Sequence, residues 1–201
     1  MITAVVTNYN KPPHIVKRCV DSIVRHGVAV ILVDDNSDDR DYLSSLSASI
    51  VPLPKNIGQY RAFRIGLEMV DTTYVMRVDS DDYILGIPDI SSDADAYINN
   101  IDNKVSLDVE VFLSRPYAGL NGAVIKTEIA KDIWFTELKR YGDIVNFALL
   151  TSRYECVMNE KCLYVYDRQY STVTKAKRSN RLEDIRTAVR TARELIRSKN
   201  G

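Results

Sequence analysis

Short apolar runs alternate with helical patterns along the first half of the chain. Short runs that are largely apolar predict buried strands over residues 2–6, 28–33, 50–53 and 74–78. Between them, apolar residues recur at three- and four-residue steps after Lys11-Pro12-Pro13 and, less regularly, after Gly58, which predicts two helices. Strands that are apolar throughout and alternate with helices indicate an α/β fold, with a mostly parallel sheet covered on both faces. Ligands bind such sheets at the carboxyl ends of the strands.

The second half of the chain has weaker patterns. Apolar residues at alternate positions predict a half-exposed strand over 107–113, and further patterns predict strands over 122–127 and 162–166 and a helix over 143–152. A C-terminal helix is predicted over about residues 180–198, with the apolar stripe Leu182, Ile185, Val189, Ala192 and Ile196 and an opposite face that carries Arg186, Arg190, Arg193 and Arg197. The stripe is expected to face the body of the protein or a second subunit, as in a homodimer.

Composition and charge narrow the class of protein. With 201 residues, 45% hydrophobic and 27% charged, the chain is long enough for one globular domain with a real core. The net charge is zero, but residues 1–100 hold 9 basic and 14 acidic side chains, whereas residues 101–201 hold 18 and 13. The basic half suits an anionic partner or is ordinary solvated surface. The three cysteines suit reduced thiols, and no run approaches a membrane span, so a cytoplasmic location is expected.

The segment Arg77-Val78-Asp79-Ser80-Asp81-Asp82 directly follows an apolar strand. Two carboxylates at 4 Å repel by about 4 kcal/mol at an effective dielectric constant near 20, so a cation is expected beside them. A divalent ion with oxygen ligands, Mn²⁺ or Mg²⁺, suits this group, with substrate phosphates completing its shell. An acidic turn or a helix N-cap is the alternative.

Two further polar clusters follow predicted strands. They are Thr7-Asn8-Tyr9-Asn10 after the first strand and Asp34-Asp35-Asn36-Ser37-Asp38 after the second. Because the carboxyl ends of parallel strands meet at one edge of a sheet, the three clusters are expected to converge there. Each cluster alone also suits a helix N-cap.

Together with Asn56-Ile57-Gly58, Ala62 and Gly66, these motifs make the first 85 residues resemble the inverting family 2 glycosyltransferases of the GT-A fold. The resemblance implies a Rossmann-related sheet flanked by helices, in one domain over 1–201, with a nucleotide-sugar donor half over about 1–85 and an acceptor half over about 86–175. It implies a donor site formed by Thr7, Asn8, Tyr9, Asp34, Asp35, Asn56, Gly58, Arg61, Arg64, Asp79, Ser80 and Arg168. It also implies that Asp79 and Asp81 form the D-x-D element, which holds the metal. Arg61 and Arg64 are surface helix residues in the alternative interpretation.

The acceptor half offers one candidate catalytic base. The resemblance implies a carboxylate at the start of a helix, and Asp143 after Tyr141-Gly142 stands there, although Gly142 replaces the family's frequent acidic neighbour. Asp143 would take the proton of the acceptor hydroxyl, with Glu137 and Asp132 as weaker candidates. A plain N-cap is the alternative. Trp134 and Phe135 suit an acceptor platform or, more simply, aromatic core.

The predicted function is metal-dependent transfer of a sugar from a nucleotide-sugar, a UDP-sugar by family frequency, to an acceptor hydroxyl with inversion. Two acceptor classes stay open: a glycan or lipid-linked saccharide, and a nucleic acid such as a modified base in DNA. The alternatives are a nucleotidyltransferase, whose Gly-rich signature near the first strand is missing from the sequence, and an inactive nucleotide-binding module.

Overall fold

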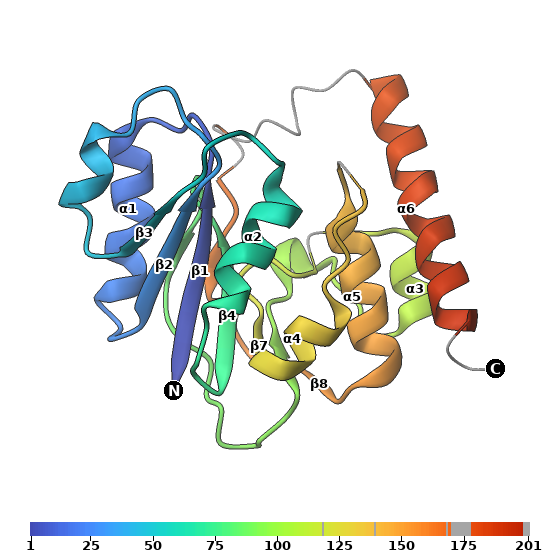
Figure 1. Cartoon of the computed structure of the whole chain (residues 1–201). Coiled ribbons are helices and arrows are strands. Elements are labelled where there is room, and N and C mark those ends of the chain that lie inside the picture. The colour runs from blue at the N-terminus through green and yellow to red at the C-terminus, as the bar shows by residue number, and fades with distance from the viewer. Residues whose placement is uncertain (118, 139, 168, 170–177, 199–201) are drawn as a thin grey trace.

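The computed structural model describes residues 1–117, 119–138, 140–167, 169 and 178–198 (Figure 1). The strands are β1 (Ile2–Asn8), β2 (Ala29–Asp34), β3 (Ser49–Pro52), β4 (Tyr74–Asp79), β5 (Tyr83–Ile84), β6 (Ala96–Ile98), β7 (Val124–Lys126), β8 (Cys156–Met158) and β9 (Tyr164–Val165). The α-helices are α1 (Pro13–Val24), α2 (Gln59–Glu68), α3 (Val109–Ser114), α4 (Thr127–Ile133), α5 (Gly142–Arg153) and α6 (Arg178–Ser198). Short 3₁₀ helices cover Asp41–Ser45 and Ile101–Asn103.

A seven-stranded sheet in the order β3-β2-β1-β4-β7-β6-β8 forms the centre of the molecule. The strands from β3 to β4 run parallel, β7 is antiparallel to β4 and β6, and β8 is parallel to β6. The predicted mostly parallel α/β sheet is therefore confirmed. A separate two-stranded pair joins β5 to β9 and brings the C-terminal part of the chain beside the end of β4.

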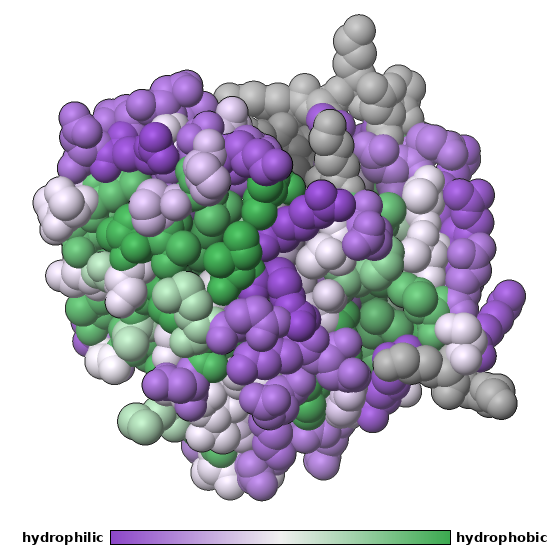
Figure 2. Space-filling model, in the orientation of Figure 1, coloured by the Kyte–Doolittle hydropathy of each residue, from purple (hydrophilic) through white to green (hydrophobic). Residues whose placement is uncertain are grey.

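Helices cover both faces of the parallel strands, with α1 and α2 on opposite sides (Figure 1). Helix α2 lies very close to the sheet at Gly66, which has no side chain. A Cβ atom there would stand only 2.6 Å from Cγ1 of Val5 and 2.8 Å from Cγ2 of Val33. Its outer face is polar, and Figure 2 shows a hydrophilic band over α2 and α4 between hydrophobic areas over the strands and over α5. The close approach makes α2 a rigid support for side chains at its first turn.

The C-terminal helix α6 packs along α5 (Figure 1). Ala188 and Ala192 are fully buried there, and the guanidinium of Arg153 donates to the carbonyl of Leu195 at 3.2 Å. The predicted stripe therefore faces the body of the protein, except Leu182, which is 51% exposed. The homodimer through this helix stays a prediction. Among the described residues, no helix is long and apolar enough to cross a membrane.

The strand predicted over 107–113 is wrong, since this segment contains α3. The Asp108 carboxylate caps the helix by accepting from the backbone N–H of Val111 at 2.9 Å. Phe112 and Leu113 are both buried, although they are neighbours in the sequence. Adjacent buried residues fit a helix turn but not the alternating faces of a strand, so the N-cap decided the local structure.

Candidate functional site

The carboxyl ends of β1, β2 and β4 meet at one rim of the sheet, as the sequence predicted. In the strand ladders, Asn8 lies opposite Asp34 and Thr7 lies opposite Asp79. The Asn8 amide joins all three strand ends, because its Nδ2 donates to Asp34 at 2.8 Å and its Oδ1 accepts from the Ser80 hydroxyl at 3.0 Å. These polar side chains are buried and satisfied, so they form a pre-organised floor for the rim.

The second carboxylate after β2 holds the loop that leads into α2. Asp35 accepts from the backbone N–H groups of Ile57 and Gly58 at 2.7 and 2.9 Å. Gly58 has a φ of 91°, in the region that favours glycine. The backbone conformation therefore explains the glycine at the end of the motif Asn56-Ile57-Gly58. Burial raises the pKa of the Asp35 carboxyl, although the two amide donors oppose this shift.

Asp79 ends β4 and is surrounded by donors. The guanidinium of Arg77 donates to its Oδ1 at 2.7 Å, and Nε2 of Gln59 donates to the same oxygen at 2.5 Å. Arg77 is only 4% exposed, and the carboxylates of Asp79 and Asp143 raise its pKa despite the opposing effect of burial. Arg77 is thus a permanent buried cation beneath the rim. This role was not predicted from the sequence, although an arginine inside an otherwise apolar strand is a visible signal.

Asp81 lies beside a lysine that the sequence analysis also missed. The Lys11 ammonium stands 2.8 Å from its Oδ2, and both side chains are largely buried. Arg18 supports the same turn by donating to the Asp81 carbonyl at 3.0 Å and by pairing with Asp167 at 2.9 Å. The lysine satisfies part of the need for positive charge that the clustered carboxylates create.

These carboxylates suit a metal site whose other ligands are substrate phosphates and water. Among the described residues, no group of three or more His, Cys, Asp or Glu side chains is arranged to hold a metal ion. Mg²⁺-type ions on nucleotide substrates need only one or two carboxylates, with phosphates and water as the other ligands. Asp79 and Asp81, each with one carboxylate oxygen outside the bonds described above, fit that smaller requirement.

Beneath the rim, Asp82 completes a closed set of hydrogen bonds. It accepts from the hydroxyl of Tyr164, from the amide of Asn121 at 3.5 Å and from the backbone N–H of Asp167 at 2.8 Å. Tyr164 in turn accepts from the backbone N–H of Asp79 at 3.3 Å. Burial, together with the charges of Asp79 and Asp81, raises the pKa of Asp82 to about 8. This set links the D-x-D turn to β9 and to the loop before β7.

The candidate base Asp143 lies near the same rim. Helix α5 begins at Gly142 with Tyr141 as its N-cap residue, so Asp143 is in the first turn rather than at the cap. The N-cap alternative for Asp143 is therefore wrong. Its Oδ1 accepts from the hydroxyl of Tyr60 on α2 at 3.0 Å. A carboxylate from the second half of the chain and a helix from its first half are thus in direct contact, and the positive end of the α5 dipole favours a carboxylate there.

The other candidates for the base are engaged elsewhere. Asp132 accepts from the hydroxyl of Tyr154 at 3.0 Å, and Glu137 is 69% exposed and lies 3.9 Å from Arg61. Trp134 is buried and stacks on Phe63 with ring centroids 4.0 Å apart. It therefore belongs to the aromatic core, the simpler of its two predicted roles.

The remaining donor-site candidates differ in their surroundings. Tyr9, Asn56 and Arg61 are exposed near the ends of β1 and α2. Arg64 donates to the carbonyl of Lys131 on α4 and pairs with Glu68 at 2.5 Å, which suits its surface-helix alternative. Arg168 lies outside the described residues.

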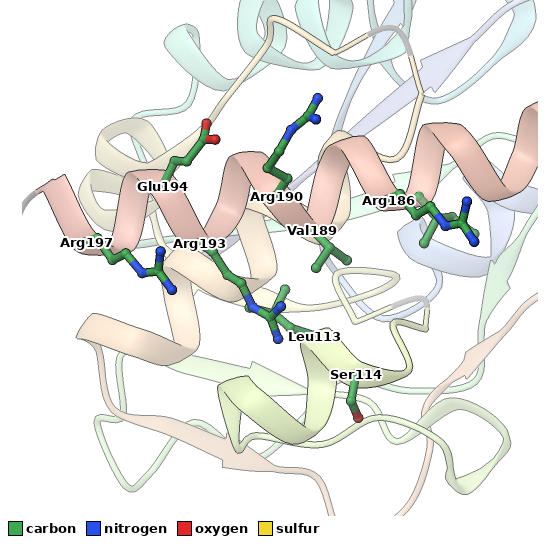
Figure 3. Close-up of a pocket in the computed structure, with 9 residues that line it drawn as sticks. Leu113, Ser114, Arg186, Val189, Arg190, Arg193, Glu194 and Arg197 are labelled. Atoms are coloured by element: carbon green, nitrogen blue, oxygen red, sulfur yellow. The ribbon is translucent and has the colours of Figure 1, made fainter.

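A groove of about 500 Å³ lies between α3 and α6 (Figure 3). Its walls carry the arginines of α6, and its apolar residues include Leu113 and Val189. Arg193 points towards α3, where it pairs with Glu110 at 3.1 Å, and Glu194 stands among the arginines that line the groove (Figure 3). The arginines therefore do not form one uninterrupted basic face.

Comparisons with known proteins agree with this geometry. Residues 3–86 match the family model described as glycosyl transferase family 2. A search of curated protein sequences gave no match. Among solved structures, TarS 1–349 of S. aureus in complex with UDP-GlcNAc is 17% identical, with a TM-score of 0.64 over 93% of this chain and 65% of that one. TarS 1–349 in complex with UDP is 18% identical, with a TM-score of 0.59 over 81% of this chain and 59% of that one.

Another structure of S. aureus TarS is 19% identical, with a TM-score of 0.63. The match covers 81% of this chain but only 36% of that chain, so the chain spans well under two thirds of that protein. Identities this low establish the fold alone, whereas the family model covers the segment that holds all the strand-end clusters of the rim. Residues 3–86 are therefore similar to glycosyl transferase family 2, and the chain has the GT-A-like α/β fold that its sequence predicted.

Proposed function

We propose that the protein transfers a sugar from a nucleotide-sugar donor, a UDP-sugar, to an acceptor hydroxyl with inversion at the anomeric carbon. The observation that carries the proposal is the contact between Asp143 and Tyr60 at the rim where β1, β2 and β4 end. A carboxylate from the second half of the chain is thereby held beside the donor-half residues of a family 2 segment. The UDP and UDP-GlcNAc complexes of the similar TarS fold support the choice of donor.

The chain's own residues supply binding and proton transfer in this mechanism. The strand-end cluster around Asn8 and Asp34 binds the nucleoside of the donor at the rim. Asp143 accepts the proton of the acceptor hydroxyl while the nucleoside diphosphate leaves from the opposite face of the sugar, which inverts the anomeric carbon. Asp79 and Asp81 would hold Mn²⁺ or Mg²⁺, and such an ion supplies positive charge to the departing diphosphate.

The first test concerns the metal. Asp81→Ala should abolish manganese-dependent binding of UDP, measured by calorimetry, because the variant loses a carboxylate ligand for the ion. Lys11→Met is the matched control, since it removes the protein's own cation from the same carboxylate and should leave manganese-dependent binding in place. Equal UDP affinity of Asp81→Ala and the wild type in manganese would exclude Asp81 from the site.

The second test concerns the base. Asp143→Asn keeps the size of the side chain and should leave UDP binding intact, while hydrolysis or transfer of UDP-GlcNAc falls by about 10²-fold or more, the usual scale for a lost general base. Because Asp143 is not the N-cap, the substitution leaves the capping geometry of α5 in place. Turnover near that of the wild type would move the role to Glu137, Asp132 or another residue.

The acceptor that we propose is a saccharide, free or lipid-linked. Carboxylates interrupt the arginines of α6, because Glu183 lies 3.9 Å from Arg186 and Glu110 pairs with Arg193. Such an alternation disfavours a long polyanion on this helix. Binding of duplex DNA whose affinity falls steeply with salt concentration would instead favour the second class, a modified base in DNA.

A further inference from the structure

The strongest unassigned feature of the molecule is the buried contact between the first turns of α2 and α5. We propose that Tyr60 is a positioning residue, which orients the carboxylate of Asp143 from the space that Gly142 leaves open. The inference rests on the proposed role of Asp143 as the base. The experiment below separates a failure of this inference from a failure of that role.

Gly142 makes the contact sterically feasible. A Cβ atom at this position would lie 3.1 to 3.3 Å from Cδ2, Cε2 and Cγ of the Tyr60 ring, closer than most side-chain contacts in proteins. The glycine leaves room for the ring of Tyr60, which packs directly against it.

Tyr60 is itself held firmly. Its side chain is 7% exposed, and its backbone carbonyl accepts from Nε1 of Trp134 at 3.0 Å. Trp134 stacks on Phe63, one turn further along α2. A phenol fixed in this way can hold a carboxylate in one orientation at little entropic cost, as groups that position a catalytic residue must do.

The charges around the phenol keep it a donor. Burial, followed by the charge of Asp143, raises the pKa of Tyr60 well above its ordinary value, so the hydroxyl keeps its proton at any working pH. The charge of Arg77 on β4 opposes this shift. Because the hydroxyl bonds to Oδ1 of Asp143, the second oxygen of that carboxylate can accept the proton of the substrate hydroxyl.

The test is Tyr60→Phe, which removes one hydroxyl and keeps the ring. We expect the affinity for UDP to stay within about twofold, while turnover of UDP-GlcNAc falls roughly tenfold, at the lower end of what misplacing a catalytic group costs. Tyr74→Phe is the matched control, because Tyr74 is also buried and its hydroxyl also donates to a carboxylate, that of Asp93 at 3.3 Å, at the amino end of β4. This control should keep full turnover.

A double-mutant comparison separates positioning from structural damage. In the Asp143→Asn background, Tyr60→Phe should cause no further loss of turnover, because the group that it orients is gone. Gly142→Ala, which crowds the ring without removing the hydroxyl, should lower turnover in the same direction. Full turnover by Tyr60→Phe, or an equal further loss in the Asp143→Asn background, overturns the inference and leaves the proposed function standing. A wild-type protein that binds UDP but never turns over the donor overturns both.

Discussion

The buried arginine beneath the rim gives the sharpest stability prediction. Arg77 is 4% exposed, donates to Asp79 at 2.7 Å and donates to the amide oxygen of Asn121 at 3.1 Å. Arg77→Met keeps most of the apolar length of the side chain but leaves the Asp79 carboxylate without its cation. Breaking a buried ion pair by removing one partner costs about 3–5 kcal/mol, because the remaining charge is uncompensated.

The lower end of that range applies to Arg77→Met. The side chain of Asp79 is 17% exposed, and Gln59 still donates to it in the variant. We therefore expect the free energy of unfolding to fall by about 3 kcal/mol. For a chain of this length, that corresponds to a melting temperature lower by roughly 6 to 12 °C.

The assay is urea unfolding at neutral pH, followed by circular dichroism, with the slope m compared between variants to confirm that the unfolded states are alike. The control is the double variant Arg77→Met/Asp79→Asn, in which the uncompensated charge is removed together with its partner. It should recover at least half of the loss. A loss below about 1 kcal/mol in Arg77→Met would refute the reasoning, since that is the scale of an exposed pair. A double variant as unstable as the single one would refute it as well.

Two further predictions concern the second half of the chain. Ending the chain before residue 178 should lower the melting temperature and expose apolar surface of α5, because Ala188 and Ala192 of α6 are fully buried. An unchanged melting temperature would show that α6 contributes nothing to the stability of the body. Cys156 should resist iodoacetamide at pH 8.5 in the folded protein and react after unfolding. Burial, with the nearby charges of Asp95 and Glu155, raises its pKa to about 12. The reactive thiolate therefore forms only near that pH in the folded protein. Mass spectrometry of the alkylated peptides checks this, and rapid labelling of folded Cys156 would contradict it.

Much of the sheet could be predicted because its signals are local. Each parallel strand is largely apolar, and each polar cluster of the rim follows such a strand directly, so the sequence alone predicted these strands and their convergence. The helix after Gly58 and the C-terminal helix were likewise visible in the spacing of their apolar residues. Local signals failed at α3, where alternating apolar residues suggested a strand and the cap at Asp108 produced a helix.

The partners within the site were decided only by the tertiary structure. Tyr60 and Asp143 are 83 residues apart, and Lys11 and Asp81 are 70 residues apart. No periodicity or motif relates such positions, because their contact depends on how α5 packs on α2 and how α1 begins beside the end of β4. The sequence by itself determined which groups stand at the carboxyl ends of the strands. Packing decided which of them meet, because a hydrogen bond requires about 3 Å between two groups, and only the folded chain brings distant residues that close.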